Sequence, residues 1–331
     1  MIVDNKWKEL GYVNEPIPEG TDIKAEIRRM CKEKNAVILA HYYTDGEIQD
    51  IADFIGDSLA LAQKAAKTEA DIIVMCGVHF MGETNKILCP DKVVLVPDLN
   101  ATCSLAESCP AKEFGDFVKA HPDHTVISYV NTTAATKALT DVVVTSSNAK
   151  QIVESFPKEE KIIFGPDQNL GNYINSITGR NMLLWNGACH VHEKFSLEKI
   201  LQLKAEHPKA KILVHPECKG AVVKVADKVG STAALLKFSI SDEATEFIVA
   251  TESGILHEMQ KACPQKTFIP APPEDSTCAC NECNFMKLIT MQKLYNCLKY
   301  EWPTVEVDKD IAEKAVKPIN KMLEISEKLG I

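Results

Sequence analysis

Twelve cysteines in a chain of 331 residues are the first sign of chemistry in this sequence. The start of the chain shows no export signal. We therefore expect a reducing, cytoplasmic compartment, in which stable disulfides are rare and some thiols bind a metal. The informative cysteines are Cys103, Cys189, Cys278, Cys280 and Cys283. Three thiolates are enough to hold an iron–sulfur cluster with one iron left open, and such an iron acts as a Lewis acid in dehydrations. Zinc, with His190 or His192 as further ligands, is the alternative.

A second group of reactive side chains stands at the ends of short apolar runs, which are typical of buried strands. Its members are His41, Tyr43, Tyr129, Asn131, Ser146, Ser147, His215 and Glu217. Ser58 and Thr232 lie near glycines at expected helix starts, where backbone N–H groups bind carboxylates or phosphates. This donor-rich set predicts a small polyanionic substrate. The alternative for Ser146 and Ser147 is that they only cap the helix that follows.

The strands expected before these residues recur in a fixed order. The first runs are VILAHYY, VISYVN and ILVHPE, the second are DIIVMCG, DVVVTSS and EFIVATE, and the third are KVVLVPD, KIIFGPD and KTFIPAP. Apolar residues at helical spacing fill the segments between them, as in HFMGETNKIL and GILHEMQKAC. This alternation, with a period of about 87 residues, predicts three related units with parallel sheets. Ligands bind outside the carboxyl ends of such strands, so the polar groups of the three units should meet in one cavity.

The expected fold class is therefore α/β: three homologous three-layer αβα domains with short parallel sheets, in a pseudo-threefold arrangement around a central cavity. The first three expected domains are residues 1–105, which include an N-terminal helix, 106–190 and 191–285. A C-terminal helical segment, 286–331, is expected to pack back on the first domain. Thr21 is the expected N-cap of the N-terminal helix.

Charge and composition exclude several classes of protein. The formal net charge is −9, and an acidic chain repels phosphate backbones, so nucleic acid is not an expected partner. A hydrophobic share of 45% and a charged share of 25% are typical of a globular chain and not of a disordered one. No apolar run approaches the roughly 18 residues that a membrane helix needs, so no membrane is expected either.

The chain contains, in this order, the motifs AHYY, GDS, VMCGVHFM, CSLA, SYVNT, TSSNA, GPDQNLG, WNGACHVH, HPEC, GST and CNFMK. The quinolinate synthases of bacteria and archaea have similar motifs in the same order. The chain resembles that family from about residue 20 to about residue 300. Because so many motifs agree together, the resemblance is to the family and not merely to a fold.

The resemblance implies an enzyme with three similar α/β domains around a central cavity and one [4Fe–4S] cluster per chain. It implies the condensation of iminoaspartate (iminosuccinate) with dihydroxyacetone phosphate to quinolinate, with loss of phosphate and two waters, in de novo NAD biosynthesis. An iminoaspartate-producing enzyme, L-aspartate oxidase or aspartate dehydrogenase, is the further partner that could hand over the first substrate. Another iron–sulfur hydro-lyase, with an aconitase-like open iron, is the alternative function.

Carried over residue by residue, the resemblance also implies a site. Its cluster ligands are Cys103 in CSLA, Cys189 in WNGAC and Cys283 in CNFM, where the NFMK that follows matches the family. The implied substrate-binding residues are His41, Ser58, Tyr129, Val130, Asn131, Ser146, His192, His215, Pro216, Glu217 and Thr232. The expected catalytic residues are Tyr43, Glu217, His41 and His215. Tyr43 and Glu217 are the candidates for a proton shuttle, and the two histidines for stabilising negative charge.

Overall fold

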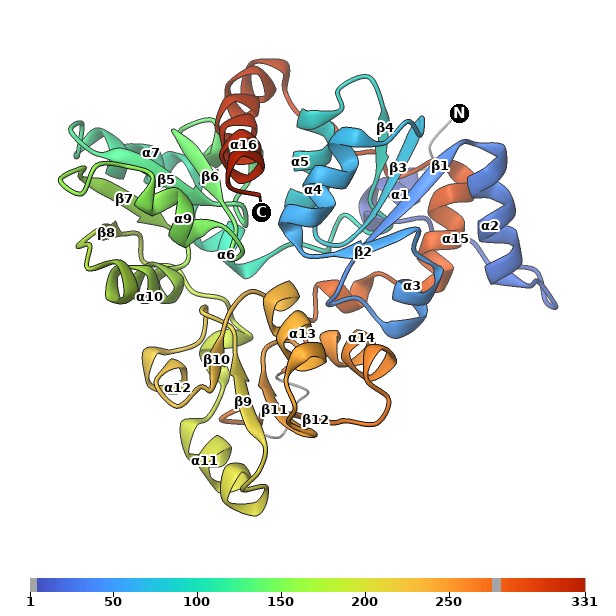
Figure 1. Cartoon of the computed structure of the whole chain (residues 1–331). Coiled ribbons are helices and arrows are strands. Elements are labelled where there is room, and N and C mark those ends of the chain that lie inside the picture. Colours follow the sequence, from blue (N-terminus) through green and yellow to red (C-terminus); the bar gives the residue numbers. More distant parts are fainter. Residues whose placement is uncertain (1–4, 276–280, 331) are drawn as a thin grey trace. The chain divides into compact units, whose positions relative to one another are not determined.

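The computed structural model describes residues 5–275 and 281–330, so the expectations on Cys278 and Cys280 lie outside the described residues. The chain divides into two compact units. Unit 1 comprises Met1–Cys103 and Asn284–Val316, and unit 2 comprises Ser104–Cys283 and Lys317–Ile331. Unit 1 contains one four-stranded parallel sheet and unit 2 contains two, and helices flank each sheet (Figure 1). The predicted α/β class with three short parallel sheets is confirmed.

Unit 1 is a three-layer sandwich. Its strands are β1 (Ala36–His41), β2 (Phe54–Gly56), β3 (Ile72–Cys76) and β4 (Val93–Leu95), in the order β2-β1-β3-β4. Its helices are α1 (Asn5–Leu10), α2 (Ile23–Glu33), α3 (Gly46–Ile51), α4 (Ser58–Lys67), α5 (His79–Leu88), the short η2 (Met286–Leu288), α15 (Met291–Tyr300) and the first part of α16 (Lys309–Leu329). Helices α2 and α15 pack together on one face of the sheet, and α4 and α5 pack on the other (Figure 1). Both faces of β1 and β3 are therefore apolar, which explains their continuous hydrophobic runs.

Unit 2 holds the other two sheets. The strands of its first sheet are β5 (Thr125–Tyr129), β6 (Val142–Val144), β7 (Ile162–Gly165) and β8 (Leu183–Leu184), in the order β6-β5-β7-β8. The helices of this part are α6 (Ser104–Ser108), α7 (Ala111–Lys119), α8 (Ala134–Lys137), α9 (Ala149–Glu154) and α10 (Gln168–Thr178).

The second sheet of unit 2 repeats the same order, β10-β9-β11-β12. Its strands are β9 (Lys211–Val214), β10 (Lys228–Val229), β11 (Glu246–Ala250) and β12 (Thr267–Pro270). The helices of this part are the short η1 (His192–Lys194), α11 (Leu197–Glu206), α12 (Gly220–Val223), α13 (Thr232–Ser241) and α14 (Ile255–Ala262). Its core lies between the sheet and α11, where Phe195, Ile200 and Ile212 are buried.

The strand orders correct one detail of the sequence repeat. The run DVVVTSS forms β6, an edge strand that corresponds to β2 and β10, and not to β3 as the sequence order suggests. The third sequence run of this part, KIIFGPD, forms β7, which corresponds to β3 and β11. Strands β2 and β10 have only three and two residues, too few to show a strand pattern, so they escaped recognition.

A hydrogen-bonded aspartate repeats in all three sheets. In each, a carboxylate just before the edge strand accepts a hydrogen bond from a backbone N–H of the neighbouring strand, fifteen residues earlier. The pairs are Asp53 with Ile38, Asp141 with Val126 and Asp227 with Ile212, at N–O distances of 2.8, 2.8 and 2.7 Å. The N–H of each aspartate also donates to the carbonyl of its partner. This reciprocal contact fixes where each edge strand begins.

The helical termini differ from expectation at one cap. Asp22, and not Thr21, caps α2, because its carboxylate accepts from the N–H of Ala25 at 3.1 Å, whereas the Thr21 hydroxyl donates to the Pro18 carbonyl.

The later part of α16 belongs to unit 2, where Asn148 donates to the Ser326 hydroxyl. The expected domain boundaries stay a prediction. Within the described residues, no helix is long and apolar enough to cross a membrane.

The repeated aspartates can be tested by Asp141→Ala and Asp227→Ala. Each change leaves a strand N–H without its acceptor, so each should lower the free energy of unfolding by about 1–2 kcal/mol. Urea denaturation of the full chain measures this. The control is Asp116→Ala, since Asp116 is exposed and faces Lys119 across 3.6 Å at the surface. Its effect should stay within about 0.5 kcal/mol. Equal effects of all three changes would contradict the structural role.

Candidate active site

The strand-end residues expected from the sequence occupy equivalent positions in the three sheets. His41 and Tyr129 end β1 and β5, and His215 directly follows β9. The three sets are His41, Tyr43 and Ser58; Tyr129, Asn131 and Ser146; and His215, Glu217 and Thr232. In each set the second residue stands 2 positions, and the third 17 positions, after the first. The third residue always follows the edge strand, so each sheet presents the same three positions at its carboxyl end.

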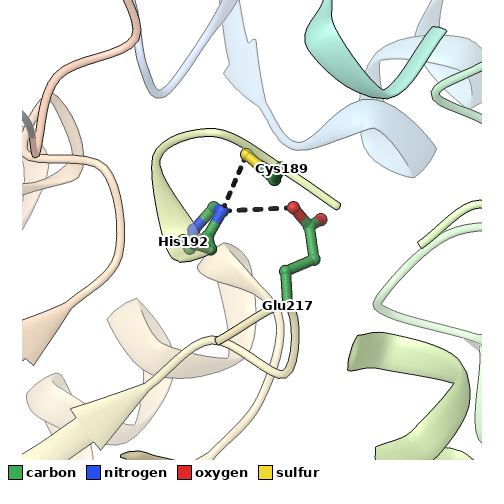
Figure 2. Close-up of side chains that lie close together, drawn as sticks. All are labelled: Cys189, His192 and Glu217. Carbon is green, nitrogen blue, oxygen red and sulfur yellow. Dashed lines mark hydrogen bonds and ion pairs between the residues drawn. The ribbon is translucent and has the colours of Figure 1, made fainter. Parts of the chain in front are cut away.

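In unit 2 these positions build a buried network around Glu217. The Tyr129 hydroxyl donates to Glu217 Oε1 at 2.5 Å, and His192 Nδ1 lies 3.1 Å from Glu217 Oε2. The same Nδ1 lies 3.2 Å from the Cys189 Sγ, so the ring stands between the carboxylate and the thiol (Figure 2). His192 Nε2 contacts the Thr251 hydroxyl at 2.9 Å. Because Nδ1 faces the carboxylate, the ring carries a proton on Nδ1 and donates it to Glu217.

His215 is oriented by the turn that follows β9. The backbone N–H of Glu217 donates to His215 Nδ1 at 3.3 Å, so the proton of a neutral ring is on Nε2. Nε2 in turn lies 3.2 Å from the Ser146 hydroxyl. The ring stacks on His192 with 4.6 Å between the ring centroids. His215 is therefore held as an N–H donor at the ends of both sheets of unit 2.

The electrostatics of this network favour one ionised carboxylate. Burial by itself raises the pKa of Glu217, but the attraction of His192 and His215 and the hydrogen bonds from His192 and Tyr129 keep that pKa below its usual range. Asp167, which is also fully buried, shows the opposite. Burial and the nearby Glu217 charge raise the pKa of Asp167. The negative charge of the site is therefore held on Glu217.

The serines after β6 do not cap the next helix with their side chains. The Ser147 hydroxyl donates to Ser231 at 2.9 Å, and the Ser146 hydroxyl faces His215. Thr232 is the first residue of α13 and is buried, while Ser231 caps that helix by accepting from the N–H of Ala234. The hydroxyls of both sheets thus gather at one place, and the N-cap residue of α9 is Asn148, not Ser146 or Ser147.

Unit 1 presents its own set in the same way. The backbone N–H of Tyr43 donates to Nδ1 of the buried His41 at 3.2 Å, as Glu217 does to His215. The Tyr43 ring meets the His41 ring at a centroid distance of 4.5 Å, and the Tyr43 carbonyl accepts from Lys287. Ser58 is the first residue of α4, which Asp57 caps. Both histidines of the repeat are therefore fixed in the same tautomer.

The turns after β1 and β5 are held by donors that the sequence patterns did not reveal. The fully buried Lys137 donates to the carbonyls of Val130 and Thr132. In unit 1, Gln49 donates to the carbonyls of Tyr42 and Thr44, which occupy the equivalent positions. In the second sheet of unit 2, Pro216 lies in the equivalent turn after β9. The position equivalent to Lys137 is occupied there by Val223, whose side chain cannot donate a hydrogen bond. The burial of Lys137 is a property of the fold, so the sequence carried no signal for this support.

The three cysteines expected as cluster ligands share one backbone contact. In each sheet, the third strand in chain order is β3, β7 or β11. The residue three positions after that strand donates its backbone N–H to the carbonyl of the residue two positions before the cysteine. The contacts are His79 to Ala101 before Cys103, Gln168 to Gly187 before Cys189, and Ser253 to Asn281 before Cys283, at 2.7, 2.8 and 3.0 Å. Each cysteine also follows the fourth strand of its sheet. The three thiols are therefore equivalent in the repeat.

Exposure separates the same three from the other thiols. Of the ten cysteines in the part of the chain that the structure describes, seven are buried, and only Cys103, Cys189 and Cys283 are half-buried. Burial raises the pKa of Cys109 to about 12 and raises the pKa of Cys218 and Cys297 as well. Such thiols stay protonated and act as small apolar side chains.

Parallel sheets with acid–base groups and half-buried thiols at their carboxyl ends define an α/β enzyme. A family model described as "Quinolinate synthetase A protein" matches residues 25–324. Curated proteins named quinolinate synthase are similar over most of their length. The protein of Thermosynechococcus vestitus is 56% identical over 311 residues, which cover 94% of this chain and 97% of that protein. Those of Trichormus variabilis and Chloroherpeton thalassium are 57% and 54% identical, over 92% of this chain and 94% and 95% of theirs. The chain belongs to the quinolinate synthase family.

Thiol labelling tests the separation of the cysteines. Iodoacetamide added to the native, metal-free chain near neutral pH should label Cys103, Cys189 and Cys283. It should spare Cys218 and Cys297, whose burial excludes the reagent and raises their pKa. Peptide mass spectrometry locates the label, and the unfolded chain, labelled at all twelve cysteines, is the control. Rapid labelling of Cys218 in the native chain would contradict the described burial.

Proposed function

We propose that this chain condenses iminoaspartate with dihydroxyacetone phosphate to quinolinate, in the cytoplasm, as a step of NAD biosynthesis. The two substrates equal quinolinate, one phosphate and two waters in atoms and electrons, so the reaction needs acid–base chemistry but no net oxidant. The observation that carries the proposal is the buried carboxylate of Glu217 between Tyr129 and His192, because it is a base and proton relays surround it.

The proposed cofactor is one [4Fe–4S] cluster per chain, held by Cys103, Cys189 and Cys283. The described residues fit this group: the three thiols are equivalent in the repeat and half-buried, and thiolates are the ligands that iron–sulfur clusters require. Cys283 shares the repeated contact with the other two, which supports its choice over its neighbours in C-x-C-x-x-C. When bound, the cluster supplies a Lewis-acidic iron for the dehydration steps.

The residues of unit 2 supply the proton transfers in this proposal. Glu217 takes a proton from substrate carbon or nitrogen during tautomerisation, and Tyr129, which already donates to it, relays that proton. Unit 1 contributes Tyr43 as a second shuttle, since it occupies the position equivalent to Glu217. His192 holds the Glu217 carboxylate in place through its 3.1 Å contact.

The donors of the site would bind the substrate anions. His215 presents Nε2–H beside the Ser146 hydroxyl, and Thr232 stands at the start of α13, where free N–H groups favour carboxylate or phosphate. Asn131 Oδ1 is buried and has no hydrogen-bond partner among the described residues, an unfavourable state that a substrate N–H or O–H would relieve. Val130 and Pro216 shape the same turns. His41 and Ser58 are the equivalent donors that unit 1 contributes.

Metal analysis tests the cofactor. Protein purified without oxygen should be brown and contain about four irons per chain, as one cubane cluster requires. Cys283→Ser should abolish the cluster, because one of three thiolates is lost, whereas Cys280→Ser should leave it. Cys218→Ser, at a buried position, is the control that should retain iron. One tightly bound zinc and no iron would overturn the cofactor assignment. Cluster loss in Cys280→Ser together with retention in Cys283→Ser would refute the ligand choice.

The role of Glu217 is tested by Glu217→Gln. The amide keeps the size of the side chain but cannot accept a proton, so the rate of quinolinate formation should fall by roughly 10²–10⁴-fold with iron content unchanged. Ultraviolet absorbance or chromatography of the product measures the rate. Glu198→Gln, at an exposed position of α11, is the control with full activity expected. Full activity of Glu217→Gln would remove this residue from the mechanism.

The same assay separates the proposal from the alternative hydro-lyase. A hydro-lyase with an open iron would dehydrate a hydroxy acid but form no quinolinate from iminoaspartate and the triose phosphate. Handover from L-aspartate oxidase or aspartate dehydrogenase is a further proposal. It predicts that either enzyme, supplied with aspartate and with its electron acceptor, supports quinolinate formation more efficiently than free iminoaspartate does.

A further inference from the structure

Two buried carboxyl groups contact the cysteine loops of unit 2, and the mechanism above does not use them. Asp167 and Glu252 each stand two residues after the third strand of their sheet, and both side chains are fully buried. One oxygen of Asp167 accepts from the N–H of Cys189 at 3.0 Å, and one oxygen of Glu252 accepts from the N–H of Cys283 at 3.0 Å. The same contact therefore occurs twice, in two different sheets.

The second oxygen of each group anchors it locally. Asp167 Oδ1 accepts from the N–H of Leu170 at 2.8 Å and caps α10, and Glu252 Oε2 accepts from the N–H of Gly254 at 2.7 Å. Each carboxyl thus joins a rigid strand end to a loop that carries a thiol. The next residue in the chain adds a second link, because the N–H groups of Gln168 and Ser253 donate to carbonyls two residues before the cysteines.

The first sheet lacks this feature. Val78 occupies the position of Asp167 and Glu252 in unit 1, two residues after β3, and its side chain has no acceptor. The carboxyl contact is therefore not a requirement of the fold, since the sheet of unit 1 forms with valine there. The two carboxyl groups are therefore better explained by an effect on the cysteine loops that they contact than by a need of the sheet.

We propose that Asp167 and Glu252 are positioning residues that hold the backbone of Cys189 and Cys283 so that the two thiols are placed before the cluster binds. Two anchors on each loop, at the cysteine N–H and at the carbonyl two residues earlier, restrict the backbone of the loop and so limit the positions that the cysteine side chain can take. Loops that are held in advance lose less entropy when they bind a ligand. The ligand role of the two cysteines rests on the proposed function, whereas the hydrogen bonds to their amides do not.

Serine substitutions separate the two bonds of each carboxyl. In Asp167→Ser the hydroxyl is a good helix cap and can still accept from Leu170, but it is too short to reach Cys189. In Glu252→Ser the hydroxyl can accept from Gly254 in a local turn and cannot reach Cys283. Asp22→Ser, at the side-chain cap of α2 in unit 1, where Asp22 accepts from the N–H of Ala25 at 3.1 Å, is the matched control.

Two measurements on the full chain test the proposal. Hydrogen exchange of the metal-free chain should become about five- to tenfold faster at the Cys189 amide in Asp167→Ser and at the Cys283 amide in Glu252→Ser, each without change at the other cysteine. After anaerobic loading with iron and sulfide, each variant should release iron to a chelator several-fold faster than the unaltered chain. The control variant should match the unaltered chain in both measurements.

The outcomes are distinguishable from failure of the proposed function. If the unaltered chain takes up no iron, the cluster assignment fails, while the exchange result still decides whether the carboxyl groups hold the loops. Unchanged exchange at both cysteine amides would overturn the proposal, as would equal acceleration of both loops by either variant. Faster exchange with unchanged iron release would also overturn it, because the held loops would then have no effect on the cluster. If one variant does not fold, the other carries the test, since each sheet makes its own prediction.

Discussion

Burial of the Glu217 carboxylate is the constraint on which the site of unit 2 depends. A buried charge is costly unless donors surround it, and these donors come from two sheets. Tyr129 ends β5 in the first sheet of unit 2, while His192 and His215 lie beside the second sheet of unit 2. The carboxyl ends of both sheets must therefore meet at this residue. The same contacts place His192 against the Cys189 thiol, so the acid–base group and the thiol are fixed together (Figure 2).

Repetition of one sheet plan explains how a chain with a simple architecture presents varied chemistry. Each sheet begins its edge strand with the same aspartate contact and offers the same three positions after its strands. At the second of these positions stand a tyrosine, an amide and a carboxylate, Tyr43, Asn131 and Glu217. The backbone plan is thus conserved within the chain, while the side chains differ. Because different side chains occupy equivalent positions, one of the three is a carboxylate, Glu217, and the other two can donate hydrogen bonds.

The cysteines follow the same logic. Three thiols stand after equivalent strands and share one backbone contact, whereas the other described thiols are buried and hold raised pKa values or serve in packing. In the two sheets of unit 2, the carboxyl groups of Asp167 and Glu252 contact the cysteine loops. In unit 1, Val78 occupies the equivalent position. The support of the thiols is therefore unequal although their positions are equivalent.

The sequence by itself determined the parallel α/β class and predicted which polar residues stand at the strand ends, because both appear in short-range patterns. Buried strands are continuous apolar runs, and their polar ends, such as His215 and Glu217, follow directly. The tertiary structure decided what these patterns cannot encode. The edge strands β2 and β10 are too short to show a period, and their pairing alone aligns the repeat. The contact of Tyr129 with Glu217 joins residues 88 positions apart, and the bond from Asp167 to Cys189 spans 22. Such contacts depend on how strands pair and helices pack, and no local periodicity carries that information.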